Sequence, residues 1–177
     1  GSLFSNAISC TRRIFPRPRG WMAPASMPES LATTMQRTPL MKPMPELDAL
    51  LTRAKALGVY GTKERSVINS ANREGIAAIV KQQFEVGTQV AAHGMMPMIE
   101  PEVNIKSATR AECDTILLEE ILKNLDAVPA GQQVMLKLSL PVVPGTFEPL
   151  VSHPKVLRVV ALSGGYQRPE ACLELAK

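Results

Sequence analysis

Short apolar runs alternate with amphipathic segments from Pro43 to the C-terminus, and this order restricts the fold of the 177-residue chain more than any other feature. The apolar runs have the length of strands, whereas apolar residues in the longer segments recur with the spacing of a helix. Strands separated by helices predict parallel βαβ units, because a parallel connection needs a crossover. The chain is therefore expected to be an α/β protein.

The predicted strands cover residues 59–68, 95–103, 133–140 and 155–162. The predicted helices cover residues 47–58, 72–92, 109–128 and 168–177, with a short one at 147–152. The third and fourth strands are apolar almost throughout, which predicts that both of their faces are covered. In the two long helices these apolar residues are expected to face inward: Ile76, Ile79, Val80, Phe84, Val90 and Ala91, then Cys113, Ile116, Leu117, Ile121 and Leu125.

The position of the polar residues decides between two α/β architectures. A closed (β/α)8 barrel needs about 250 residues, so an open flavodoxin-like sheet fits this length better. However, ionisable side chains gather at the carboxyl end of one strand after another, where the active sites of barrels lie. We therefore expect residues 38–177 to form part of a (β/α)8 TIM barrel, with four of its strands and their helices.

Residues 1–37 contain five arginines and four prolines but a single acidic residue, Glu29. They account for the net charge of +4, because basic and acidic residues balance in the rest of the chain. With no excess charge on the predicted folded part, a nucleic-acid partner is not expected. The composition leaves open whether this basic segment is a transit-like leader, a disordered extension or non-native sequence.

The chain offers little for a metal site or a disulfide framework. Cys10, Cys113 and Cys172 are odd in number and far apart, so reduced and mostly buried thiols are expected. The histidines, His93 and His153, do not lie at metal-ligand spacing, and no metal is expected. No uninterrupted apolar run reaches the roughly 18 residues of a membrane-spanning helix, so no membrane partner is expected.

Side-chain alternation places the ionisable residues of the predicted strands on one side of the sheet. Three pairs are predicted to share a face: Lys63 with Arg65, Glu100 with Glu102, and Lys137 with Ser139. The opposite face of the third strand carries three leucines suited to packing under helices: Leu136, Leu138 and Leu140. The strands are thus predicted to direct their charged groups into one interior.

Lys137 is the strongest candidate for a catalytic group. An ammonium among the Met and Leu side chains of its strand is costly to desolvate unless it has a partner or loses its charge. A neutral lysine can attack a ketone and form an iminium, an electron sink for the carbanion left when a carbon–carbon bond breaks. The alternative is a lysine that extends from the strand end into water.

The other candidates fit the same chemistry, and each has a structural alternative. Glu100 and Glu102, with Lys63 nearby, suit the proton transfers that dehydrate a carbinolamine, although Glu102 equally suits a structural salt bridge. Arg65 suits a phosphate, but an isolated arginine is also commonly solvated or ion-paired. The turn Ser163-Gly164-Gly165, between a strand and a helix, offers backbone N–H groups to a phosphate, or is an ordinary turn.

These motifs together resemble the class I (Schiff-base) fructose-bisphosphate aldolases, most closely their bacterial-type branch. The resemblance runs from about Pro39 to Lys177 and rests on motifs in the same order along the chain. The motifs are Leu40-Met41-Lys42-Pro43, Gly61-Thr62-Lys63 with Arg65-Ser66, Gln82-Gln83-Phe84-Glu85-Val86, Pro97 to Asn104, Val134-Met135-Leu136-Lys137-Leu138, and Val159 to Tyr166.

The resemblance implies a role for each candidate. Lys137 would form the Schiff base, Glu100 would be the main general acid and base, and Lys63 a charged partner near the imine. Glu102 would support the lysine network, and Arg65 would help bind the far phosphate. The phosphate of the dihydroxyacetone half would be bound by Ser163 with Gly164.

The implied activity is the reversible cleavage of fructose 1,6-bisphosphate into dihydroxyacetone phosphate and glyceraldehyde 3-phosphate, with no metal or other cofactor. Another lysine-dependent aldolase, acting on keto acids or free sugars, and a non-catalytic truncated paralogue are the alternatives. The full-length enzyme is expected in the cytoplasm, or in an organelle such as a plastid if residues 1–37 are a leader. A homo-oligomer is left open.

The chain also departs from the family. It has no counterpart of the aspartate on the first strand, the lysine at the end of the third, or the phosphate-site arginine after the eighth. Residues 1–37 do not resemble the first three strands, and the chain stops in the helix after the seventh, so the resemblance implies that residues 38–177 correspond to about strands 4 to 7 with their helices. We therefore expect an interior fragment that is inactive alone. Glu64 stands where related sequences often carry an apolar residue, but its parity directs it away from the site.

Overall fold

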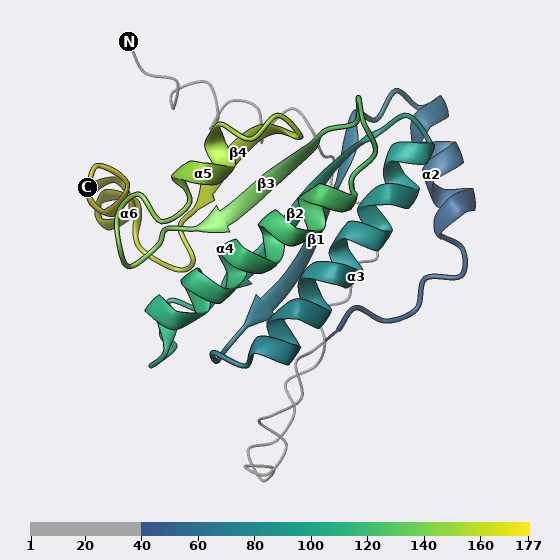
Figure 1. Ribbon diagram of the computed structural model, residues 1–177. Coiled ribbons are helices and arrows are strands. Elements are labelled where there is room, and N and C mark those ends of the chain that lie inside the picture. The colour runs from purple at the N-terminus through teal and green to yellow at the C-terminus, as the bar shows by residue number, and fades with distance from the viewer. Residues whose placement is uncertain (1–39) are drawn as a thin grey trace, which may run out of the picture.

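A computed structural model describes residues 40–177, which form a four-stranded parallel sheet with its connecting helices (Figure 1). The strands, side by side in chain order, are β1 (Gly61–Ile68), β2 (Met96–Val103), β3 (Val134–Ser139) and β4 (Val156–Leu162). The helices are α2 (Leu47–Ala56), α3 (Arg73–Ala92), α4 (Arg110–Ala127), α5 (Glu148–Val151) and α6 (Arg168–Leu175). The α/β prediction is confirmed, with element bounds within two residues of those expected. The basic segment at residues 1–37, with its three open interpretations, and Cys10 lie outside the described residues.

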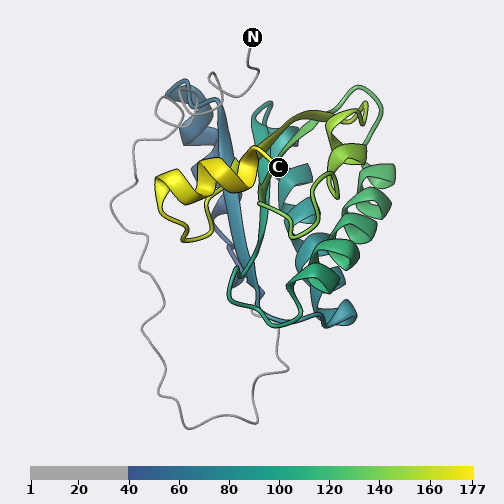
Figure 2. The ribbon, with the colours of Figure 1, turned by 90° about the vertical axis from the view of Figure 1, so that its left-hand side faces the viewer.

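The main hydrophobic core lies between the sheet and the two long helices, α3 and α4, which cover one face of it (Figures 1 and 2). It joins the inward side chains of these helices to Ile99 and Val103 of β2 and to Leu136 and Leu138 of β3. The two predicted apolar stripes are buried, except that Ala91 is only partly so. Burial of side chains of this size stabilises the fold by about 1.5–3 kcal/mol each, so these helices fix which face of the sheet stays free for a site.

Local sequence determines where α3 begins and ends. The Oδ1 atom of Asn72 accepts a hydrogen bond from the backbone N–H of Gly75 at 2.8 Å, which caps the helix at its first turn. Gly94 has φ of +66°, a left-handed conformation that ends the helix and favours glycine. The chain then enters β2 at Met96, so the capped ends of α3 position the strand that carries Glu100 and Glu102.

The opposite face of the sheet carries α6 but neither of the long helices (Figure 2). The expectation that β4 is covered on both faces is wrong, since Leu157 is 45% exposed. The reason is its place at the edge, where β4 pairs with β3 alone among the described residues and packs beside the short α5. Cys113 is buried as expected, but Cys172 is exposed because α6 buries none of its residues. No helix within residues 40–177 is long and apolar enough to cross a membrane.

Glu64 lies on the helix-covered side of β1, as its parity predicted, and is only 5% exposed. Its Oε1 atom accepts a hydrogen bond from the hydroxyl of Thr62 at 3.1 Å, while Oε2 has no hydrogen-bond partner among the described residues. Burial raises the pKa of this carboxyl from 4.5 to about 8, and the hydrogen bond from Thr62 opposes the shift only in part. Glu64 is therefore protonated in the folded protein at neutral pH.

The stability of the fold should fall as Glu64 becomes ionised in the unfolded chain. At low pH both states hold the proton, but between pH 4.5 and 8 only the unfolded state releases it, so unfolding becomes easier as the pH rises. The unfolding free energy of Glu64→Gln, taken relative to that of the wild type, is expected to be about 3 kcal/mol higher at pH 8 than at pH 5. Urea unfolding of the full-length protein at the two pH values measures this difference. The matched control is Glu85→Gln, at a solvent-exposed position of α3, which should show no such gain.

Candidate active site

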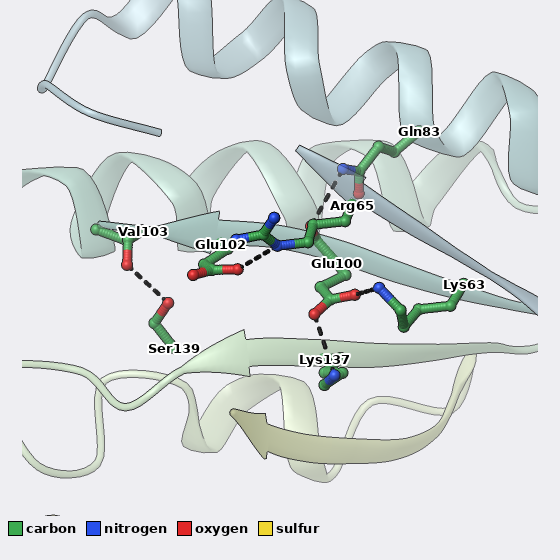
Figure 3. A network of polar contacts seen from close by, with 8 residues as sticks. All are labelled: Lys63, Arg65, Gln83, Glu100, Glu102, Val103, Lys137 and Ser139. Atoms are coloured by element: carbon green, nitrogen blue, oxygen red, sulfur yellow. Dashed lines mark hydrogen bonds and ion pairs between the residues drawn. The ribbon is translucent and has the colours of Figure 1, made fainter. Parts of the chain in front are cut away.

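The charged residues of the predicted site lie on three neighbouring strands (Figure 3). In the register between β1 and β2, Lys63 is opposite Met98. In the register between β2 and β3, Met98 is opposite Met135, which brings Glu100 level with Lys137 two residues further along. The middle strand therefore holds its carboxylate between a lysine on each of its neighbours.

Glu100 accepts contacts from both lysines with separate oxygens. Its Oε1 atom lies 3.1 Å from the Nζ atom of Lys137, and its Oε2 atom accepts a short hydrogen bond from the Nζ atom of Lys63. Glu100 is 3% exposed, whereas the side chains of Lys137 and Lys63 are 20% and 34% exposed. A buried carboxylate needs such partners to remain charged, and the same contacts allow protons to pass between it and an amine.

Lys137 therefore has a partner instead of extending only into water. Its apolar surroundings differ from those expected, because Leu136 and Leu138 point into the core on the other face of the strand. The apolar residues on its own side of the sheet are Met98, Met135 and Val160, which form a small separate cluster. Leu140, expected to pack under the helices, lies beyond the strand and lines the pocket together with Lys137, because the strand ends at Ser139.

Arg65 and Glu102 form a second ion pair on the same face (Figure 3). The Nε atom of Arg65 lies 2.6 Å from Oε2 of Glu102, and this hydrogen bond raises the pKa of the guanidinium. The arginine is 52% exposed and Glu102 is 12% exposed. The pair matches the salt-bridge alternative for both residues, and it leaves Glu102 without a contact to the lysines. Arg65 still presents an exposed cation beside the site.

A pocket of about 720 Å³ opens beside Lys137, at the carboxyl ends of β2, β3 and β4. One wall is formed by Glu100, Glu102 and Lys137, and the other by α6 and the turn at residues 163–166. Ser163 and Gly164 of this turn line the pocket, whereas Lys63 and Arg65 do not. These two residues instead form ion pairs with Glu100 and Glu102, which do line it. The turn is closed by a 3.0 Å hydrogen bond from the N–H of Tyr166 to the carbonyl of Ser163.

Three further residues contact the site or its neighbouring segments. No site role was predicted from the sequence for Gln83 or Arg110, and Ser139 was predicted to lie on the site face. The Nε2 atom of Gln83, on α3, donates to the backbone carbonyl of Glu100 at 3.3 Å. Ser139, placed on the site face, instead donates its hydroxyl to the carbonyl of Val103 at 2.8 Å and so joins β3 to β2. Arg110, at the start of α4, donates hydrogen bonds to the hydroxyl of Tyr166 in the turn and to the carbonyl of Leu140. No sequence motif indicates this role, because these partners lie 56 and 30 residues away along the chain.

Within residues 40–177 no group of three or more His, Cys, Asp or Glu side chains is arranged to hold a metal ion. The charged residues of the site form instead an alternating set of cations and carboxylates. Such a set can bind an anionic ketone, supply an amine as a nucleophile and move protons to or from it.

Comparison with known proteins identifies relatives of the chain. No protein-family model matches it. It is 48% identical over 149 residues to a protein of Synechocystis sp. named "Fructose-bisphosphate aldolase class 1". The match includes 84% of this chain, and the chain spans about half the length of that relative. The resemblance to class 1 fructose-bisphosphate aldolases is thus confirmed, and the parallel sheet with alternating helices is consistent with part of a TIM barrel.

The turn that lines the pocket should tolerate no side chain at Gly164. This residue has φ of +62°, and a Cβ atom would lie 2.6 Å from Cγ2 of Ile105. The control is Gly58→Ala, because Gly58 has a similar φ of +74° but open space around it. Gly58→Ala is expected to cost about 1 kcal/mol for backbone strain, and Gly164→Ala at least about 1 kcal/mol more for the steric overlap.

Urea unfolding of the two variants of the full-length protein measures both costs. The extra loss should shrink when Gly164→Ala is combined with Ile105→Ala, which removes the overlapping methyl group. Equal losses for Gly58→Ala and Gly164→Ala would contradict the close packing of the turn on Ile105.

Proposed function

We propose that the full-length protein carrying this segment, a homologue of class 1 fructose-bisphosphate aldolases, cleaves fructose 1,6-bisphosphate through a Schiff base on Lys137. The products are dihydroxyacetone phosphate and glyceraldehyde 3-phosphate, and the reaction is reversible. The observation that carries the proposal is the buried Glu100 carboxylate in contact with lysines from two adjacent strands. Imine formation needs an amine and an acid–base group within hydrogen-bonding distance of it, and this pair supplies both.

In the proposed mechanism, the neutral Nζ atom of Lys137 attacks the C2 carbonyl of the ketose. Glu100 protonates the departing hydroxyl, so the carbinolamine loses water and becomes an iminium. The C3–C4 bond then breaks, its electrons form an enamine with the iminium, and the Glu100 carboxylate accepts the proton of the C4 hydroxyl. This cleavage releases glyceraldehyde 3-phosphate, and Glu100 returns the accepted proton to C3 of the enamine. Water then hydrolyses the resulting iminium, which releases dihydroxyacetone phosphate, restores the neutral amine of Lys137 and returns a proton to Glu100.

The remaining residues act on charge and position. Lys63 contacts the other oxygen of Glu100 and would offset negative charge near the imine. Glu102 would hold Arg65 through their ion pair, and Arg65 would assist the far phosphate of the sugar. Ser163 and Gly164 line the pocket and would bind the phosphate of the dihydroxyacetone half. No metal is required in this scheme, because the iminium is the electron sink.

Covalent trapping tests the role of Lys137. In the full-length protein, borohydride reduction with dihydroxyacetone phosphate should attach the three-carbon unit to Lys137, since its amine faces the pocket and touches Glu100. The reaction is run with excess EDTA, which should not reduce the yield. Peptide mass mapping locates the adduct.

Two matched variants serve as controls for the trapping experiment. Lys137→Arg keeps a positive charge beside Glu100 but cannot form an imine, so it should give no adduct. Lys155→Arg alters a lysine whose Nζ donates to the carbonyls of Leu125 and Asp126, away from the pocket, and should react as the wild type does. An adduct on Lys63 or Lys155 instead would contradict the assignment.

The 177-residue chain expressed alone should show no measurable cleavage of fructose 1,6-bisphosphate. Within residues 40–177, β1 and β4 each pair with a single strand, so each presents an unpaired backbone edge that favours association. The family residues expected on the first, third and eighth strands are also missing, which removes groups that position substrate and move protons. A coupled assay on purified chain, with size-exclusion chromatography, measures both properties. A monodisperse monomer with aldolase turnover would overturn this expectation.

A further inference from the structure

We propose that Arg110 is a positioning residue, which fixes the turn at residues 163–166 at a set distance from Lys137. This inference rests on the proposed function, because that turn is the proposed site for the phosphate of the dihydroxyacetone half. Arg110 is the first residue of α4 and does not line the pocket. It can therefore act on a substrate only through the groups that it holds.

Arg110 joins two segments that meet at the pocket. Its Nη1 atom donates to the hydroxyl of Tyr166 at 2.9 Å, and its guanidinium lies 5.8 Å from the centre of the Tyr166 ring. Its Nη2 atom donates a short hydrogen bond to the backbone carbonyl of Leu140. Since both contacts use one planar guanidinium, the turn after β4 and the end of β3 are held in a fixed relation.

The segment after β3 is held by the same helix a second time. Asp114 lies one turn after Arg110 on α4, is 1% exposed, and accepts a hydrogen bond from the backbone N–H of Val142 at 2.9 Å. Burial raises the pKa of this carboxyl, and the hydrogen bond from Val142 and the nearby Arg110 oppose the shift. The start of α4 is thus hydrogen-bonded to Leu140 and Val142, which lie three and five residues after Lys137.

The turn itself is held on its other side by close packing. Gly164 and Gly165 both approach Ile105, which lies between β2 and α4. Tyr166 closes the turn through its backbone N–H and lines the pocket. Arg110 is the only charged side chain among the described residues that hydrogen-bonds to Tyr166. Its removal should let the turn shift relative to Lys137, while the Glu100 contacts stay intact.

The predicted effect is a loss of phosphate-dependent capture. In the full-length protein, Arg110→Ala should raise by about tenfold the concentration of dihydroxyacetone phosphate needed for half-maximal borohydride trapping on Lys137, as expected for losing charge-assisted hydrogen bonds. Trapping of unphosphorylated dihydroxyacetone should not change, because that ketone makes no use of the turn. Arg110→Lys keeps the charge and should recover part of the loss.

Two further variants make the test specific. Tyr166→Phe removes the hydroxyl that accepts from Arg110 but keeps the ring, and should weaken capture of the phosphorylated ketone in a chain that folds normally. Arg73→Ala is the matched control, because Arg73 is likewise the first residue of a long helix, α3, but pairs with Glu119 on the surface. It should leave trapping of both ketones unchanged.

Each outcome decides the inference. Equal weakening for the two ketones would mean that Arg110 only supports the fold, and no weakening for either would mean that it does not position the turn; both overturn the proposal. If the wild type traps neither ketone, the proposed function is wrong, and calorimetric titration with inorganic phosphate then decides on Arg110. Weaker phosphate binding by Arg110→Ala and Tyr166→Phe would still support the positioning role, and unchanged or absent binding would overturn it.

Discussion

Two-residue alternation along the parallel strands places the side chains of this protein in two different environments. One set packs beneath α3 and α4, and the other set faces the pocket. The core is on one side because the helices bury their apolar stripes there, and this leaves the other side for the charged groups. The position of Glu100 between Lys63 and Lys137 follows from this division and from the register of three adjacent strands.

The sequence was sufficient to predict the order of the elements and the face of the sheet on which the candidate charged residues lie. It also indicated part of the pocket lining, namely Glu100, Glu102, Lys137, Ser163 and Gly164. Periodicity and glycine positions determine these features locally. The choice of ion-pair partners was harder to predict, because it depends on register. Arg65 is opposite Glu100 in the sheet, yet it pairs with Glu102, while Glu100 pairs with Lys63 and Lys137. A shift of two residues along β2 separates these arrangements, and no property of either strand alone determines it.

Arg110 shows a second limit of sequence-based prediction. Its partners belong to the ends of two later strands, and they come together only when the sheet has formed in the order β1 to β4. Before that, Arg110 is one of several charged residues at the start of an amphipathic helix, where acidic residues are the more favourable choice. A cation placed at this end of α4 gains little from the helix dipole, so its contacts with Leu140 and Tyr166 explain its presence better than helix stability does.

Glu64 and Glu100 show how differently two buried carboxyl groups behave on neighbouring strands. Both are almost fully buried, but Glu100 contacts the Nζ atoms of two lysines, whereas Glu64 receives one hydroxyl hydrogen bond and has an oxygen without a partner among the described residues. Burial without a counter-charge favours the protonated form, which is why the pKa of Glu64 rises to about 8. A charge can be retained inside this sheet only on the face where strands bring opposite charges together. The pocket face is therefore where a buried carboxylate finds lysine partners, whereas on the helix-covered face the burial of Glu64 lowers the stability of the folded protein as the pH rises.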